Sequence, residues 1–280
     1  MLGAVEVTSL GYRTDLMIRA LEGSAVTDHG DCIVVRSPAN PTFWWGNFLL
    51  LAAPPGPGQS GRWLARFAAE FPDAAHVALG IDVTDADEVQ TAEFLEAGLR
   101  LDLSTVLTAS AVHRPPHPGH GACYRPLAGD DDWAQSRELR LAGTSAEERA
   151  EHLPFIERRA AEARRLAEAG HGAWFGAFRD GRLVAQLGLF SDGTGIARYQ
   201  DVATHPAARR QGLAGTLVWH AGQYGLAELG ASTLVIVADP GYPAIRIYRS
   251  VGFTDRETQI GLERPPAARP TMATRPPPIP

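Results

Sequence analysis

Cysteine, long apolar runs and an excess of positive charge are scarce or missing in this 280-residue sequence. Its two cysteines, Cys32 and Cys123, lie far apart, which excludes a disulfide framework and favours a reducing, cytoplasmic environment. No run of about 18 uninterrupted apolar residues is present, so we expect no membrane span and no membrane partner. The N-terminus has neither a positively charged region nor a long apolar run, so no signal peptide is expected. The formal net charge of −6 argues against a nucleic-acid partner.

Length and composition favour two domains followed by a tail. The chain is long for one small domain, and its 45% hydrophobic content is enough to form buried cores. Proline, glycine and histidine concentrate between residues 113 and 121, which predicts a linker. We therefore expect one domain over residues 1–112 and a second over 122–264. The proline-rich tail, residues 265–280, is expected to be disordered.

Hydrophobic patterning predicts alternating strands and helices in both halves, and hence an α/β (α+β) protein. In the first half we expect strands over residues 15–22, 31–36, 43–51, 76–82 and 99–108, and helices over 63–71 and 88–97. In the second half we expect helices over 133–141, over 146–168 and from 212 on, and strands over 123–127, 172–179, 182–191, 195–204 and 232–238.

The segment from Tyr199 to Leu217 reads as a strand, a basic turn and a helix. Pro206 ends the strand because it cannot donate to a sheet ladder, and Gly212 lets other groups approach the backbone closely. Unpaired N–H groups at the helix start, together with the charges of Arg209 and Arg210, predict a cradle for a diphosphate. The turn lacks both the Gly-Lys-Ser/Thr ending of a Walker loop and the three spaced glycines of a dinucleotide fingerprint. An ordinary strand–loop–helix with solvated arginines is the alternative.

A second motif lies downstream, where a short helix ends at Gly252 and a final strand opens at Phe253. Together with Ala244 and Tyr248, these residues follow the pattern Ala-x-x-x-Tyr-x-x-x-Gly-Phe. The earlier turn follows the pattern Arg-x-x-Gly-x-Ala. At this separation, the pair of motifs resembles those of the Gcn5-related N-acetyltransferase (GNAT) superfamily, over the second half of the chain.

The resemblance implies GNAT-like domains, each a mixed, largely antiparallel twisted sheet flanked by helices, and direct acetyl transfer from acetyl-CoA to an amine. The thioester arm would lie in a slot between Asp201–Thr204 and Thr233–Val237, and the diphosphate would lie on the turn. The acceptor would be a small-molecule or amino-acid-like amine. The implied cofactor-binding residues are Val202, Ala203, Thr204, Arg209, Arg210, Gln211, Gly212, Leu213, Ala214 and Gly215.

Two residues are candidates for proton transfer. Asp201 is the candidate general base, because an acid in an otherwise neutral buried strand needs a reason to be there. The alternative is a structural aspartate that bonds a neighbouring loop. The resemblance implies that Tyr248 is the acid that protonates the leaving coenzyme A thiolate, with an aromatic packing role as the alternative.

The first half of the chain repeats the order of elements in the second half. An offset of 154 residues aligns Gly58 with Gly212, Gly98 with Gly252, and Phe94 with Tyr248. The turn before Gly58 has no arginine, and Pro57 removes a backbone donor. We infer a degenerate GNAT-like copy that holds no cofactor, although two unrelated α/β segments could give the same match.

The three histidines of the linker, His113, His117 and His120, invite a metal-site interpretation. The prolines between them forbid a shared helical face, and a solvated linker gives a metal no outer support. We therefore predict no metal site. A non-catalytic acyl-CoA-binding sensor or interaction protein is the main alternative function, and the protein is expected to be a monomer or a homodimer.

Overall fold

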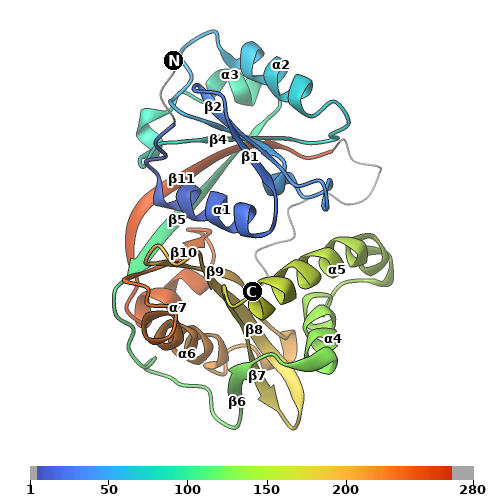
Figure 1. The fold of residues 1–280 in the computed structure, drawn as a ribbon, viewed down its shortest axis with the longest axis vertical. Coiled ribbons are helices and arrows are strands. Elements are labelled where there is room, and N and C mark those ends of the chain that lie inside the picture. The colour runs from blue at the N-terminus through green and yellow to red at the C-terminus, as the bar shows by residue number, and fades with distance from the viewer. Residues whose placement is uncertain (1–4, 267–280) are drawn as a thin grey trace. The chain divides into compact units, whose positions relative to one another are not determined.

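The computed structural model describes residues 5–266, and its contacts divide the chain into two compact units (Figure 1). Unit 1 runs to Val106 and resumes at Arg256, and unit 2 comprises Leu107–Asp255. Both have mixed, largely antiparallel twisted sheets flanked by helices, which confirms the predicted fold class. The tail predicted over residues 265–280 lies outside the described residues from residue 267 on. Among residues 5–266, no helix is both long and apolar enough to cross a bilayer.

Unit 1 contains three helices and six strands within its described residues. In chain order they are α1 (Leu10–Leu21), β1 (Ala25–Asp28), β2 (Cys32–Arg36), the 3-10 turn η1 (Trp44–Gly46), β3 (Phe48–Leu51), α2 (Ser60–Glu70), β4 (Val77–Ile81), the 3-10 turn η2 (Ala86–Glu88), α3 (Ala92–Glu96), β5 (Arg100–Ala109) and, after the whole of unit 2, β11 (Thr254–Arg264).

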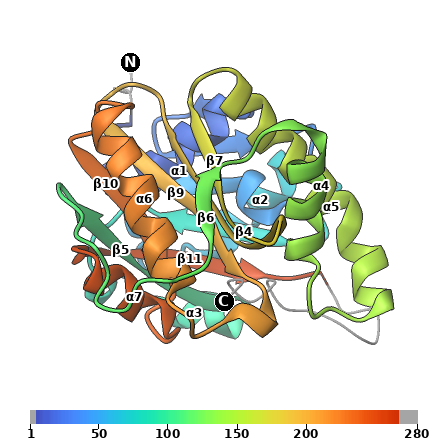
Figure 2. The ribbon, with the colours of Figure 1, turned by 90° about the horizontal axis from the view of Figure 1, so that it is seen from below.

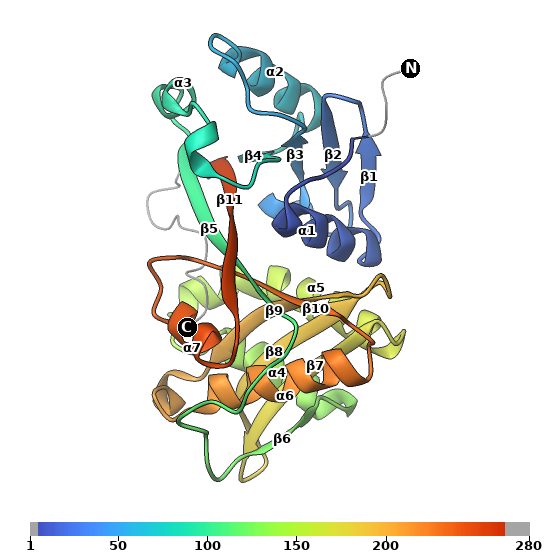
Figure 3. The same ribbon diagram turned by 90° about the vertical axis from the view of Figure 1, so that its left-hand side faces the viewer.

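Helices cover both faces of the unit 1 sheet (Figure 3). Its strands lie in the order β1-β2-β3-β4-β11-β5, and β3 and β4 are parallel. Successive strand side chains point to opposite faces, so Val34 and Val35 belong to two different cores. Val35 packs with Tyr12 of α1, whereas Val34 packs with Trp63 of α2 and Phe94 of α3.

Residues 15–22, predicted as a strand, are almost entirely part of helix α1, so that prediction is wrong. The helix begins after Ser9, whose Oγ accepts a hydrogen bond from the Tyr12 N–H at 3.4 Å. Its buried residues Gly11, Thr14 and Ile18 recur at helical spacing. The N-cap is the local signal that the pattern of apolar residues alone did not reveal.

Unit 2 follows the sequence prediction closely. After the end of β5, its elements are β6 (Cys123–Pro126), α4 (Gly129–Arg140), α5 (Ala146–Glu168), β7 (Gly172–Arg179), β8 (Arg182–Ser191), β9 (Ile196–Thr204), the 3-10 turn η3 (Pro206–Ala208), α6 (Leu213–Ala227), β10 (Thr233–Ala238), α7 (Ala244–Ser250) and the start of β11.

The unit 2 sheet separates two groups of helices (Figure 2). Strands β6 to β9 are antiparallel neighbours, and β10 lies parallel to β9. Leu217 of α6 and Ile245 of α7 pack in one core with Leu187 of β8. On the other face, Leu139 of α4 packs against Leu183 of β8. Helices therefore pack on both faces of this sheet.

Two local features of unit 2 are set by residues close together in the sequence. Ser145 and Glu148 form a capping box at the start of α5, with the Ser145 N–H 2.6 Å from Glu148 Oε2. Asp180 and Gly181 have φ values of 49° and 76° between β7 and β8. Two successive positive φ values are those of a type I′ hairpin turn.

The C-terminal strand does not stay with the domain predicted for it. From Arg256 on, β11 belongs to unit 1, where Ile260–Arg264 pairs antiparallel with Val77–Ile81. Conversely, β5 begins in unit 1, and from Leu107 it belongs to unit 2, where β10 is its neighbour. The predicted domain over 122–264 thus includes a strand that pairs in the other unit. An apolar strand pattern does not reveal which sheet a strand will join.

Candidate functional site

The two parallel strands of unit 2 separate partway along their length. Pairing between β9 and β10 ends with Arg198 opposite Val235. Beyond that point, residues 199–204 of β9 and residues 236–238 of β10 are not paired with each other. The slot predicted between Asp201–Thr204 and Thr233–Val237 is therefore present, but Thr233–Val235 are paired and do not border it. An opening of this kind leaves backbone groups available to a ligand.

A β-bulge at Asp201 and Val202 changes the direction of the side chains on β9. Gln186 lies opposite Ala203 and Gly188 opposite Gln200, so two residues face Leu187. Asp201 has a φ of 48°, in the left-handed region. Strict alternation would place Tyr199, Asp201 and Ala203 on one face of the strand, but the bulge breaks it. Tyr199 donates its hydroxyl proton to the Val218 carbonyl oxygen of α6, whereas Ala203 packs against α4.

The turn before α6 leaves backbone donors unpaired. Arg210 and Gly212 have φ values of 61° and 74°, which expose the start of the helix. In the described part of the chain, no protein acceptor bonds the backbone N–H groups of residues 210–215. Arg209 donates from Nε to the Thr204 carbonyl oxygen at 3.4 Å, and neither it nor Arg210 is paired with a carboxylate among residues 5–266. Such a turn suits an anionic ligand.

A cavity of about 440 Å³ opens above this turn. Its lining includes Tyr242 and Tyr248. It contains arginine and histidine side chains but no aspartate or glutamate. Of the predicted cofactor residues, those that line it are Val202, Thr204, Arg209, Arg210, Gly212, Leu213, Ala214 and Gly215.

Two predicted cofactor residues do not line the cavity. The side chain of Ala203 is buried on the α4 side of the sheet. Gln211 is exposed, accepts a hydrogen bond from Arg179 and donates to the Ala207 carbonyl oxygen at 3.3 Å. Both lie next to lining residues in sequence, so sequence position alone assigned them to the site.

The second motif places Tyr248 against the cavity. Ile245 packs in the core, and Tyr248, one turn on, lines the cavity with only 6% of its surface exposed. Burial raises the pKa of the Tyr248 phenol well above its ordinary value, and Tyr242 adds to the effect. Gly252 ends the motif with a φ of 113°, and Phe253 packs edge-on against Tyr199 at 5.7 Å between ring centroids.

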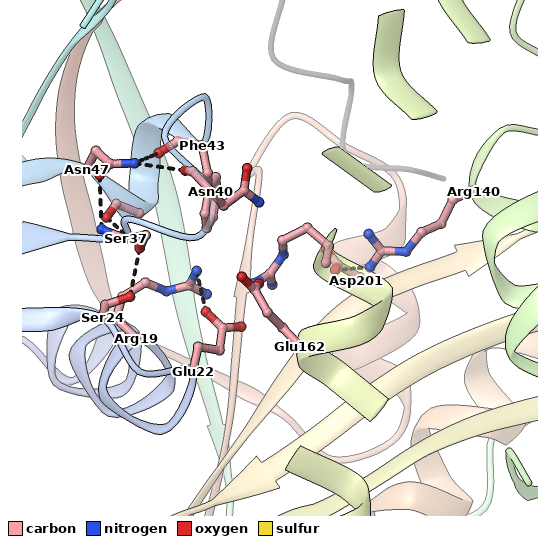
Figure 4. A network of polar contacts seen from close by, with 12 residues as sticks. Arg19, Glu22, Ser24, Ser37, Asn40, Phe43, Asn47, Arg140, Glu162 and Asp201 are labelled. Carbon is pink, nitrogen blue, oxygen red and sulfur yellow. Dashed lines mark hydrogen bonds and ion pairs between the residues drawn. The ribbon is translucent and has the colours of Figure 1, made fainter. Parts of the chain in front are cut away.

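Asp201 is paired with an arginine that the sequence did not single out. Arg140 of α4 donates from Nη2 to Asp201 Oδ2 (Figure 4). The Arg140 side chain is 6% exposed and that of Asp201 is 37% exposed. The guanidinium also lies over the ring of Trp174, 5.2 Å from its centroid. Asp201 is thus a partly exposed carboxylate at the bulge rather than the buried strand residue we expected.

A buried polar cluster fixes α4, and with it Arg140, against the sheet. Gln186 of β8 is fully buried, and its Oε1 accepts hydrogen bonds from Ser136 Oγ and from Trp174 Nε1, the latter at 3.0 Å. Its Nε2 donates to the Ser136 carbonyl oxygen at 3.1 Å. A buried amide held by three hydrogen bonds gives a rigid element. The clue to this cluster in the sequence is a glutamine in an otherwise apolar strand.

The predicted linker over residues 113–121 is part of unit 2 and lies along α6 (Figure 3). Pro115, Pro116 and His117 line the cavity, and Pro115 is buried. We had expected a solvated segment. Among residues 5–266, no group of three or more His, Cys, Asp or Glu side chains is arranged to hold a metal ion.

The turn of unit 1 that the offset of 154 residues aligns with this one is bonded to a carboxylate of the chain itself. Gly58 has a φ of 76°, close to that of Gly212, and precedes helix α2. Its N–H donates to Glu93 Oε1 at 2.6 Å. The offset of 154 residues aligns Glu93 with Ile247, which lines the unit 2 cavity. Within residues 5–266, the turn in unit 2 leaves its backbone N–H groups without a protein acceptor, whereas in unit 1 the Gly58 N–H is bonded to the Glu93 carboxylate.

A second cavity, of about 300 Å³, lies between α4 and α5 and is lined by Trp133, Arg137, Glu157 and Arg164 among others. Arg164 is paired with Asp130 and Glu168. The charge of Arg164 in this cavity is therefore compensated by two carboxylates of the protein.

Residues 134–253 match the family model described as Acetyltransferase (GNAT) family. The matched segment lies inside unit 2 and contains most of α4, the bulge, the turn of α6 and Tyr248. The match supports an acyltransferase with an acyl-CoA donor. A search among curated proteins gave no significant match.

Solved structures resemble most of the chain. A GCN5-related N-acetyltransferase from Kribbella flavida has 16% sequence identity and a TM-score of 0.60, over 92% of this chain and 96% of that one. A tandem GNAT protein from the clavulanic acid biosynthesis pathway has 15% identity and a TM-score of 0.55, over 92% and 95%. A functionally unknown conserved protein from Staphylococcus epidermidis has 10% identity and a TM-score of 0.63, over 86% and 93%. At these identities the likeness establishes the fold.

Proposed function

We propose that unit 2 is the catalytic domain of an N-acetyltransferase that moves an acetyl group directly from acetyl-CoA to a small-molecule or amino-acid-like amine. The observation that carries the proposal is the cavity where the strand opening, the unpaired N–H groups of residues 210–215 and the Tyr248 phenol meet. The match of residues 134–253 to the GNAT family supports an acyl-CoA donor.

The proposed cofactor site divides into two parts. The N–H groups of residues 210–215 and the two arginines would bind the diphosphate, since each hydrogen bond to a charged oxygen contributes about 1.5–3 kcal/mol. The open edge of β9 around Val202 and Thr204 would bind the pantetheine arm and polarise the thioester carbonyl oxygen. The cofactor would supply the acyl group and the thiolate leaving group.

The proposal is tested by incubating the protein with acetyl-CoA and a panel of amines, and measuring free thiol and acetylated product. The chain contains no lysine, because all 26 of its Lys and Arg residues are arginine. Self-acetylation of lysine side chains therefore cannot contribute to the background. Thiol release that depends on a particular amine would support the proposal. Coenzyme A binding without transfer to any amine would favour the non-catalytic sensor instead.

Asp201 is proposed as the general base that removes the amine proton. At pH 7 only about one alkylamine molecule in a thousand is neutral, so a base near the amine lowers the barrier. The same carboxylate holds the Arg140 guanidinium, so it serves as an ion-pair partner as well as a base. We therefore place its contribution at the low end for general bases, about a hundredfold in kcat.

Asp201→Asn is expected to lower kcat about a hundredfold and to leave the coenzyme A dissociation constant unchanged. Asp192→Asn is the control, because the hydrogen bonds of the Asp192 carboxylate within residues 5–266 come from Thr194 of its own turn. The pH profile of kcat separates the two roles of Asp201. Loss of the acidic limb in the variant would support a base. An unchanged kcat with a lower melting temperature would identify Asp201 as a structural partner of Arg140.

Unit 1 is proposed to be a degenerate GNAT-like copy that binds no coenzyme. Calorimetry is therefore expected to give one coenzyme A per chain, and a stoichiometry of two would contradict this assignment.

The hydrogen bond from Gly58 lowers the pKa of Glu93. Since the folded value lies below the unfolded one, the bond stabilises the fold above about pH 4.5 and this stabilisation disappears as the pH falls through the folded value. Glu93→Gln should accordingly lower the melting temperature at pH 7, and by progressively less as the pH falls below about 4.5.

A further inference from the structure

The segment between β5 and β6 is fixed onto α6 by hydrogen bonds. The Gly119 N–H donates to Thr216 Oγ1 at 2.8 Å, and the Tyr124 hydroxyl donates to the Gly119 carbonyl oxygen at 3.2 Å. Tyr124 is in turn stacked on His220 of α6, with 5.1 Å between ring centroids. These contacts hold residues 115–119 against the first turns of the helix.

Glycine is needed on both sides of this contact. A Cβ atom at Gly212 would lie 2.2 Å from the His117 carbonyl oxygen and 2.8 Å from the Gly119 nitrogen. A Cβ atom at Gly119 would lie 3.0 Å from Leu213 Cα and 2.4 Å from Tyr124 Oη. The glycine of the Arg-x-x-Gly-x-Ala pattern is therefore required by the backbone of the segment, in addition to its positive φ.

The segment also borders the proposed coenzyme site. A Cβ atom at Gly215 would lie 3.2 Å from Ile247 and 3.3 Å from Pro115, so the first turn of α6 is enclosed from two sides. His117 is an exposed side chain on the cavity lining, which it shares with Arg209 and Arg210 and with no acidic residue. An imidazole in such a position can donate a hydrogen bond to an anionic oxygen.

On the basis of the proposed function, we propose that residues 115–119 form a fixed wall of the coenzyme A site and that the His117 imidazole binds a phosphate group of the coenzyme. Three prolines, Pro115, Pro116 and Pro118, restrict the backbone of the wall. A restricted segment loses little conformational freedom when the ligand binds, which favours binding. The segment that the sequence predicts to be a linker thereby contributes to the cofactor site of unit 2.

The role of His117 is tested by calorimetry on the full chain with coenzyme A and with 3′-dephospho-coenzyme A. His117→Ala is expected to weaken coenzyme A binding about tenfold, the effect of one charge-assisted hydrogen bond. A loss confined to coenzyme A identifies the ribose phosphate as the partner. An equal loss for both ligands identifies the diphosphate. His113→Ala is the control, since His113 lies on the same segment but outside the cavity lining.

The wall is tested with substitutions that move the segment. Gly119→Ala is expected to lower the affinity for both ligands at least tenfold, because the new methyl group pushes the segment away from Leu213. Gly61→Ala is the matched control, as a Cβ atom there meets nothing within 4 Å. Thr216→Val should have a similar but smaller effect than Gly119→Ala, and Thr216→Ser, which keeps the hydroxyl, should have none.

Two failures can be told apart. If the unmodified protein binds neither coenzyme, the proposed function is wrong. If it binds both, and His117→Ala and Gly119→Ala bind them with unchanged affinity, the proposed function stands and the wall does not exist.

Discussion

Replacing Tyr248 with phenylalanine is expected to lower kcat at least a hundredfold while the affinity for coenzyme A stays the same. A positioned general acid typically contributes a factor of about 10²–10⁴. Tyr248 is buried at the cavity, and among residues 5–266 no hydrogen bond of its hydroxyl competes with a ligand. Because burial raises the pKa of the phenol, it keeps its proton through the neutral and alkaline range and is available to the leaving thiolate.

The measurement is steady-state kinetics of Tyr248→Phe beside Tyr242→Phe. Tyr242 lines the same cavity, so its variant controls for a lost hydroxyl that has no part in proton transfer. The Tyr248 variant should remain folded, because the aligned position in unit 1 is Phe94, which is 2% exposed and packs in a core of its own. Full activity in Tyr248→Phe would reduce the residue to a packing role.

Replacing Gly212 with alanine is expected to abolish measurable coenzyme A binding and to destabilise the protein. A non-glycine residue at a φ of 74° costs about 1–2 kcal/mol. The larger effect comes from the collision of the new Cβ atom with the backbone of residues 117–119, which must move away from the turn. The N–H groups of residues 210–215 would then no longer keep their arrangement.

Gly58→Ala is the matched control for this substitution. Gly58 has nearly the same φ, 76°, but a Cβ atom there would meet nothing within 4 Å. Calorimetry and thermal unfolding of the two variants therefore separate backbone strain from the collision. The control should lose a little stability and no coenzyme affinity. Equal losses of stability and of affinity in the two variants would mean that the contact with the segment is unimportant.

The secondary structure of unit 2 was predictable because its signals are local. The capping box of Ser145, the turn at Asp180 and the glycine at 212 each act within a few residues. The same is true of the spacing that places Ala244 and Tyr248 on one side of α7, where both line the cavity. The apolar residues of 15–22 also fit a short strand, and only the N-cap at Ser9 indicates that this segment is helical.

What the sequence alone determined is the fold class and the location of the turn and of Tyr248, since each depends on neighbouring residues. The tertiary structure decided the partners that are distant in sequence: Arg140 for Asp201, Glu93 for Gly58, residues 115–119 for α6 and β4 for β11. The bulge at Asp201 belongs to this second group, because it exists only relative to β8. Contacts between distant residues arise from the packing of whole elements, which a local pattern does not encode.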